Sequence, residues 1–146
     1  MKIQTKYHGE VEISEQEIWE FSNGIPGFLD EKQFTILQFP DNDVFFILQS
    51  IKNQSLGFVI TNPFTFFKEY DFKIDDGSVE QLDLESESDV LVYVILTVQE
   101  PFESTTANLQ APLIMNIKNK TAKQLILTET SYQTKHIIMP AQLKKG

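Results

Sequence analysis

The chain has 146 residues, with 12 Lys and Arg against 21 Asp and Glu, which gives a formal net charge of −9. It has no cysteine, which excludes disulfides, thiol catalysis and thiolate metal sites and suits a reducing cytosol. Its longest apolar run, residues 90–96, is far shorter than the roughly 20 residues of a membrane-spanning helix, and the N-terminus has no signal-peptide pattern. We therefore expect a single soluble, cytoplasmic domain over residues 1–146 with no membrane partner.

Charge is spread unevenly along the chain. Residues 1–65 carry 4 lysines against 9 acids, residues 66–103 carry 2 against 11, and residues 104–146 carry 6 against 1. Affinity for a phosphate backbone comes from clustered Lys and Arg, and no basic stripe occurs outside the tail, so we expect no direct nucleic-acid partner. The acidic middle suits a basic protein partner, although a solvated face that keeps the protein soluble explains it equally well.

The first half of the chain predicts short strands joined by turns. Runs of apolar, β-branched and aromatic residues predict strands at 2–7, 10–14, 33–39, 44–51 and 56–61. Ser14 and Glu17 have the spacing of a capping box, which predicts one helical turn. Gly24 and Gly27, on either side of Ile25-Pro26, predict turns of positive φ, and residues 40–43 predict a further turn.

The middle of the chain is aromatic and then strongly polar. Residues 64–74, FTFFKEYDFKI, alternate imperfectly between apolar and polar side chains and are interpreted as a strand. On such a strand Glu69 and Asp71 share one parity and point the same way. Its phenylalanines form core by default, with a peptide-binding face as the alternative. Residues 75–89 predict a short helix around Ser78–Leu82.

The second half of the chain completes the β pattern. Residues 90–99 are apolar at both parities, which predicts a central strand covered on both faces, and we expect Val90–Val98 to be the most buried strand. Residues 112–129 are two apolar runs around KNKTA and predict a hairpin, whose first strand begins after Pro112. Many short strands with turns about every 8–12 residues predict an all-β, mainly antiparallel fold. We expect a small closed or nearly closed β-barrel with one or two short helical turns.

The residue types that usually carry chemistry do not form a recognisable site. The two histidines, His8 and His136, have neither zinc-ligand spacing nor a positioned partner for general-base work. Asp75 and Asp76 lack the rest of a calcium-loop pattern, and the scattered glycines form no phosphate loop. Nothing predicts an enzyme, a metal or a cofactor, so binding is the default class.

Two alternatives remain open from the residues alone. One is a carbohydrate-active enzyme on a β-barrel, with paired acids among Glu69, Asp71 and Asp75. It requires two carboxylates that face each other across a cleft, roughly 5–9.5 Å apart. The other is RNA binding through the lysines of residues 118–123, which predicts binding that weakens steeply with salt.

Four segments of the chain are distinctive: GIPGF at 24–28, NPF followed by FFKEY at 62–70, PFESTTANLQAP at 101–112 and TKHII at 134–138. Together they resemble the FliW family of flagellar assembly factors. They occur in the family's order over nearly the whole chain, and TANLQAP combined with NPF is the specific part. The resemblance implies a compact, β-barrel-like protein of the bacterial cytoplasm without enzymatic activity.

The resemblance also implies two partners. One is flagellin, which such a protein would bind, as a chaperone does, toward the C-terminal part that is unfolded before secretion. The other is CsrA, a small dimeric RNA-binding protein that represses flagellin translation and that would be bound away from its RNA-binding surface. The two partners are expected to compete. Accumulating flagellin then leaves CsrA free to repress, and export of flagellin lets the chain antagonise CsrA.

We expect the partner surface to combine the aromatics and acids of the middle segment with the polar TANLQAP loop. The predicted partner-binding residues are Phe66, Phe67, Glu69, Tyr70, Asp71, Phe72, Asp75, Asp76, Asn108, Leu109 and Gln110. The competing interpretation is that the aromatics are all core and the acids are a solvated face. For Asn108 and Gln110, a structural role in satisfying loop backbone groups competes with a contact role.

Overall fold

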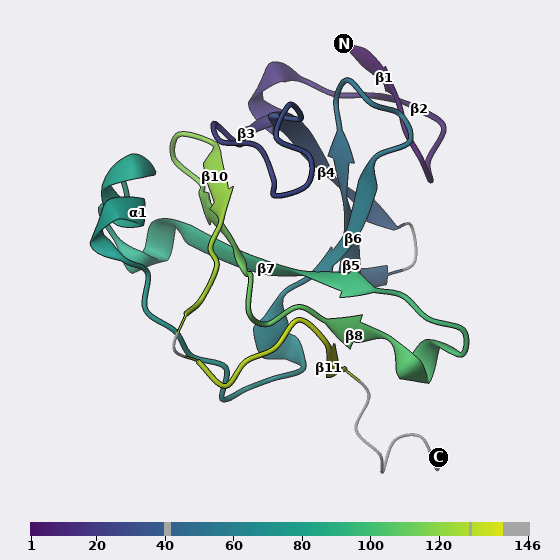
Figure 1. Cartoon of the computed structure of the whole chain (residues 1–146). Helices are drawn as coiled ribbons and strands as arrows, with labels where there is room; N and C mark the ends of the chain where they lie inside the picture. Colours follow the sequence, from purple (N-terminus) through teal and green to yellow (C-terminus); the bar gives the residue numbers. More distant parts are fainter. Residues whose placement is uncertain (40–41, 129, 139–146) are drawn as a thin grey trace.

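Short strands account for most of the regular structure and are joined by turns and brief helical segments (Figure 1). The structure is a computed structural model that describes residues 1–39, 42–128 and 130–138. Its strands are β1 (Lys2–Gln4), β2 (Glu10–Glu12), β3 (Trp19–Glu20), β4 (Gln33–Phe39), β5 (Asn42–Ser50), β6 (Gly57–Thr61), β7 (Val90–Thr97), β8 (Thr106–Ala107), β9 (Leu113–Asn116), β10 (Thr121–Gln124) and β11 (His136–Ile137). Its helical segments are α1 (Asp76–Gln81) and the 3-10 turns η1 (Glu15–Glu17), η2 (Pro63–Thr65), η3 (Glu87–Asp89) and η4 (Phe102–Ser104).

Strand pairing joins nine strands into one sheet that closes on itself. The order is β11-β8-β7-β6-β5-β4-β3-β10-β9, and a further pairing of β7 with β9 completes a ring that leaves β8 and β11 as an extension beside β7. Within the described residues, the contact of β10 with β3 is parallel and the longer ladders are antiparallel. The prediction of an all-β, mainly antiparallel, closed or nearly closed fold is confirmed.

Local turn signals in the first half of the chain are confirmed. β1 and β2 pair as an antiparallel hairpin whose turn contains Gly9 at φ 67°. The backbone N–H of Ser14 donates to the Glu17 carboxylate at 2.8 Å, as the capping box predicts. Gly24 and Gly27 have φ values of 68° and 90°, a region that favours glycine because it has no Cβ.

β9, and not β7, is the most buried strand, so the prediction for Val90–Val98 is wrong. All four residues of β9 are buried, because the strand has a paired neighbour on each edge and cover on both faces. Leu113 and Met115 face the main core, whereas Ile114 packs with Leu82 near the end of α1. β7 is central in the pairing, but most of its residues are only half-buried, and Val98 is 51% exposed.

Residues 64–74 do not form a strand, contrary to prediction. Pro63 occupies the first turn of η2, where its missing N–H is not needed, and the Asn62 side chain caps that turn. Phe66 and Phe67 are adjacent in sequence, yet both are half-buried against the same core cluster. Side chains on a strand would alternate between two faces, so the imperfect alternation reflects irregular backbone packed on one side.

The remaining predictions differ from the structure mainly at element ends. The predicted turn at 40–43 lies partly outside the described residues, and its second half is the start of β5. The helix predicted around Ser78–Leu82 begins two residues earlier. The predicted 112–129 hairpin is present as β9 and β10, but its second strand ends at Gln124.

Candidate functional site

Tyr70 lies at the centre of the aromatic segment and is nearly fully buried. Its ring contacts Phe64, Phe72 and Tyr132, with ring centroids 5.9, 5.2 and 4.8 Å away. Its hydroxyl donates a 2.6 Å hydrogen bond to the backbone carbonyl of Leu109, which is also buried. Burial, and then the nearby Tyr132, raise the pKa of Tyr70 well above its ordinary value. These two predicted contact residues therefore join the NPF–FFKEY segment to the TANLQAP loop from inside.

Phe66 and Phe67 lie nearer the surface and line an open cleft. Phe66 stacks on Phe45 at 5.9 Å, and Phe67 meets the ring of His136 edge-on at 6.2 Å. The cleft has a volume of about 630 Å³. Its lining consists of Phe66, Phe67, Lys68, Glu69, Tyr70, Leu109, Tyr132 and His136. A half-exposed aromatic floor with charged residues at its side is suited to an apolar anchor from a protein partner.

The four predicted acids are exposed, and three of them, Glu69, Asp71 and Asp75, line clefts that also contain aromatic residues. Glu69 lines the first cleft, whereas Asp71 lines a second cleft of about 580 Å³ in which Phe72 is half-buried. Asp75 caps α1 by accepting hydrogen bonds from the hydroxyl and the N–H of Ser78, and these bonds lower the pKa of Asp75. Asp76 follows in the first turn of α1 and is exposed.

This exposure bears on the enzyme alternative. Glu69, Asp71 and Asp75 are all at the surface, and the clefts that they line are open to solvent. Paired glycosidase carboxylates face each other across a cleft that admits both the sugar and a water molecule. Asp71 and Asp75 both line one open cleft, whereas Glu69 lines another.

The TANLQAP loop combines internal hydrogen bonding with exposure to two clefts. The Asn108 side-chain oxygen accepts from the N–H groups of Gln110 and Ala111, and the Gln110 amide donates to the Leu127 carbonyl. The structural role predicted for these two amides is confirmed. Leu109 lines the aromatic cleft, whereas Asn108 and Gln110 line a third cleft of about 340 Å³ with residues of GIPGF.

Two residues that were not among the predicted partner-binding residues, Tyr132 and His136, complete the aromatic cleft. The Tyr132 hydroxyl accepts from the backbone N–H of Asp71 at 3.0 Å, which ties the C-terminal segment to the acidic one. The His136 Nε2 accepts from the N–H of Gln133 at 2.7 Å. The TKHII segment was the available signal for His136, but nothing local marks Tyr132, because its neighbours are distant in sequence.

The histidines and lysines considered for other functions make contacts within the chain. His8 Nε2 lies 3.1 Å from the Gln38 carbonyl, and within the described residues no group of three or more His, Asp or Glu side chains is arranged to hold a metal ion. Of the hairpin lysines, Lys118 pairs with Asp89, Lys120 lies over the Trp19 ring, and Lys123 donates to Gln81. In the part of the chain that the structure describes, no helix is long and apolar enough to cross a membrane.

Comparison with known proteins places this chain in the class of flagellar assembly factors. The family model described as FliW protein matches residues 2–138. The flagellar assembly factor FliW of Geobacillus sp. (strain WCH70) is 52% identical over 145 residues, which cover 99% of this chain and 100% of that protein. The FliW of Bacillus subtilis (strain 168) is 51% identical over 138 residues, which cover 94% of this chain and 96% of that protein.

The three-dimensional comparison agrees. A crystal structure of the flagellar assembly factor FliW matches with a TM-score of 0.93 and 51% sequence identity, over 97% of this chain and 99% of that one. The chain belongs to the FliW family, as its four motifs indicate. The names of these relatives describe assembly factors and not enzymes, so the family's role lies in flagellum assembly.

Proposed function

We propose that this chain is a non-enzymatic, cytoplasmic regulator of flagellum assembly that binds flagellin and antagonises the translational repressor CsrA. Binding of CsrA by the chain relieves repression of flagellin translation. Family membership supports the role in assembly. The observation that carries the choice of partner is the acidic face, which we define as the exposed carboxylates of Glu69, Asp71, Asp75 and Asp76 with the neighbouring aromatic clefts.

The acidic face is suited to a basic protein that has to be found quickly and held in one orientation. An RNA-binding repressor must carry basic charge, and opposite potentials speed encounter and set orientation more than they add affinity, even where the final contact lies away from the RNA-binding surface. Affinity comes from a few apolar anchors. Phe66, Phe67 and Phe72 are half-buried beside the acids and present partly exposed rings for such anchors.

Flagellin completes the proposed switch. While flagellin accumulates it occupies the chain, CsrA is free, and translation stops. When export removes flagellin, the chain binds CsrA and translation resumes. If flagellin is added to a preformed complex of the chain with CsrA, we expect CsrA to be released. Simultaneous binding of both partners in one stable complex would contradict the competition.

Charge reversal on the acidic face tests the CsrA assignment. Replacing Glu69, Asp71 and Asp76 by Lys should slow association with CsrA and reverse its salt dependence, while the thermal midpoint stays nearly unchanged. The matched control replaces Glu12, Glu15 and Glu20, which are also exposed, by Lys, and so changes the net charge by the same amount. Association slowed equally by both variants would mean that only net charge matters. Unaltered kinetics in the first variant would move the interface elsewhere, with the TANLQAP loop next to be tested.

RNA binding through the 118–123 hairpin is tested separately. Each hairpin lysine already contacts a group of its own chain, so we expect no gel shift with RNA at physiological ionic strength. A shift that weakens steeply as salt is raised would favour the RNA-binding alternative.

A further inference from the structure

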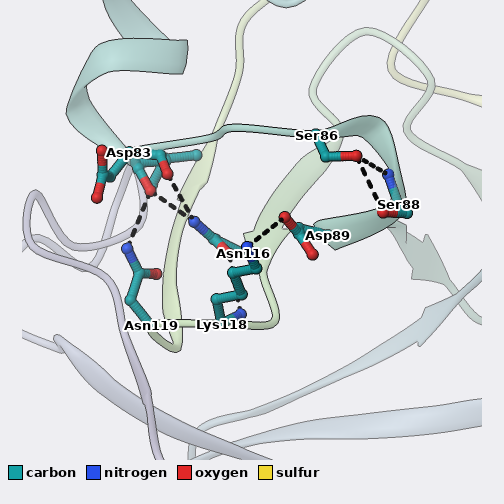
Figure 2. A network of polar contacts seen from close by, with 8 residues as sticks. Asp83, Ser86, Ser88, Asp89, Asn116, Lys118 and Asn119 are labelled. Atoms are coloured by element: carbon teal, nitrogen blue, oxygen red, sulfur yellow. Dashed lines mark hydrogen bonds and ion pairs between the residues drawn. The ribbon is translucent and has the colours of Figure 1, made fainter.

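A buried asparagine, Asn116, holds the chain where it leaves helix α1 (Figure 2). Asn116 is the last residue of β9 and is only 1% exposed. Its side-chain nitrogen donates to the carbonyls of Leu82 and Asp83 at 2.8 and 3.2 Å, and its side-chain oxygen accepts from the N–H of Lys118 at 2.9 Å. A buried amide is costly unless its polar atoms are bonded, and the bonds of Asn116 are made to the segment after α1 and to its own hairpin.

The carbonyl of Leu82 is one of those that a helix end leaves without a partner. The β9–β10 hairpin supplies several partners for this carbonyl. Besides Asn116, the Asn119 amide donates to the Leu82 carbonyl at 3.1 Å, and the Thr121 hydroxyl lies 3.5 Å from it. Asp83 follows at φ 55°, a left-handed conformation uncommon for a residue with a Cβ. The hairpin thus fixes both the end of α1 and the direction in which the chain continues.

The same hairpin holds the far end of this loop. The N–H of Ile117 donates to the Asp89 carbonyl at 2.9 Å, and the Lys118 ammonium lies 3.5 Å from the Asp89 carboxylate. Figure 2 shows Asn116 between the two ends of the loop, with Asp83 on one side and Asp89 on the other, and Asn119 on the side of Asp83. We call residues 82–89 the acidic arch.

The acidic arch forms part of a cleft that the acidic face already contributes to. Leu84, Glu85 and Glu87 line the cleft of about 580 Å³ together with Asp71 and Phe72. Glu85 and Glu87 are exposed, and Leu84 is half-buried. The arch is therefore one wall of this cleft, and the Asp71–Phe72 segment is another.

We propose that Asn116 is a positioning residue for CsrA binding: by fixing the acidic arch, it holds one wall of this cleft in a geometry ready for the partner. The proposal rests on the function proposed above. A surface that is already ordered loses less conformational freedom on binding and so binds more tightly. Asn116 does not touch the partner, because it is buried beneath the arch.

Asn116→Ala tests the proposal, with Gln49→Ala as a matched control. Gln49 is another fully buried amide, and it donates to the carbonyls of Ser50, Asn53, Gln54 and Leu56. The turn that it holds, residues 51–56, contains no acid. Both variants should lose stability, but only Asn116→Ala should weaken CsrA binding, by about tenfold and chiefly through faster dissociation. Binding is measured by surface plasmon resonance at a temperature at which both variants are folded.

A double-mutant cycle separates positioning from a general loss of stability. Glu85→Gln with Glu87→Gln should weaken CsrA binding in the wild-type background. The same pair should have a much smaller effect once Asn116 is alanine, because the arch is no longer held in place. Purely additive effects would overturn the proposal.

If Asn116→Ala does not fold, Asn119→Ala combined with Lys118→Met replaces it, since both side chains are exposed and each holds one end of the arch. This variant is judged by the same cycle with Glu85 and Glu87. Equal CsrA binding by wild type, the arch variant and Gln49→Ala overturns the role of Asn116 and leaves the proposed function intact. Failure of the wild type itself to bind CsrA overturns the proposed function.

Discussion

The hydroxyl of Tyr70 offers a test of how the two specific motifs hold each other. Tyr70→Phe keeps the ring, with its contacts to Phe64, Phe72 and Tyr132, and removes only the 2.6 Å bond to the Leu109 carbonyl. A net hydrogen bond contributes about 1 kcal/mol, and a buried carbonyl left without its partner costs about 1–3 kcal/mol. We expect Tyr70→Phe to lower the free energy of unfolding by about 1.5–3 kcal/mol. A domain of 146 residues has an entropy of unfolding of about 0.3 kcal/mol/K, so this loss lowers the thermal midpoint by about 5–10 °C.

Urea denaturation of wild type, Tyr70→Phe and Tyr132→Phe measures this effect. The Tyr132 hydroxyl accepts from the Asp71 N–H near the surface, where water can take the place of the hydroxyl. Tyr132→Phe should therefore lower the free energy of unfolding clearly less than Tyr70→Phe does. Equal midpoints for wild type and Tyr70→Phe would refute the view that this bond joins the two motifs.

The pH dependence gives an independent check on the same residue. Burial raises the pKa of Tyr70 in the folded state above its unfolded value, near 10. The folded state therefore binds this proton more tightly, and the resulting stability is complete below about pH 10 and is lost as pH rises above that value. Tyr70→Phe has no such proton, so its stability deficit relative to wild type should shrink above pH 10. A deficit that stays constant would contradict the assignment.

Three further predictions follow from burial and backbone geometry. Val94→Asp places an unpaired carboxylate at a fully buried position of β7, which should cost several kcal/mol, and a stable, cooperatively unfolding variant would contradict this. Gly24→Ala should destabilise more than Gly27→Ala in urea denaturation, because both have positive φ but only at Gly24 would a methyl group overlap neighbouring backbone. The hydrogen bonds from Ser78 lower the pKa of Asp75, so their stabilisation is present above about pH 4 and is lost as pH falls below it. Asp75→Asn should therefore differ less from wild type at pH 3 than at pH 7.

Features set by neighbouring residues could be predicted from the sequence. The capping box of Ser14 and Glu17 and the glycine turns at Gly24 and Gly27 each depend on a few residues, and all are present. Closure of the strands into a ring was also predictable in outline, because many short strands leave edges that pairing removes. The proposed partners, flagellin and CsrA, come from the family resemblance, because no local pattern in the sequence predicts them.

Features set by packing between distant segments could not be predicted. β9 is more buried than β7 because the end of α1 covers its outer face, a contact between residues more than 30 positions apart. The aromatic segment around Phe66 is not a strand, because its rings pack on one side against residues of β7 and β8 that are distant in the chain. In the sequence, nothing distinguishes Asn116 from an ordinary hairpin residue. Only the folded chain shows that its side chain bonds the acidic arch.

TANLQAP contains no ionisable side chain, and the fold uses this loop in two other ways. Its amides are used on its own backbone, which fixes a loop without a strand ladder, and Leu109 accepts the hydroxyl of Tyr70 from below. Successive residues then line different clefts: Leu109 the aromatic one, and Asn108 and Gln110 the one beside GIPGF. A reactive side chain would serve neither purpose. The loop needs groups that bond the backbone and shapes that form cleft walls, so its restricted composition suits the protein-binding role proposed above.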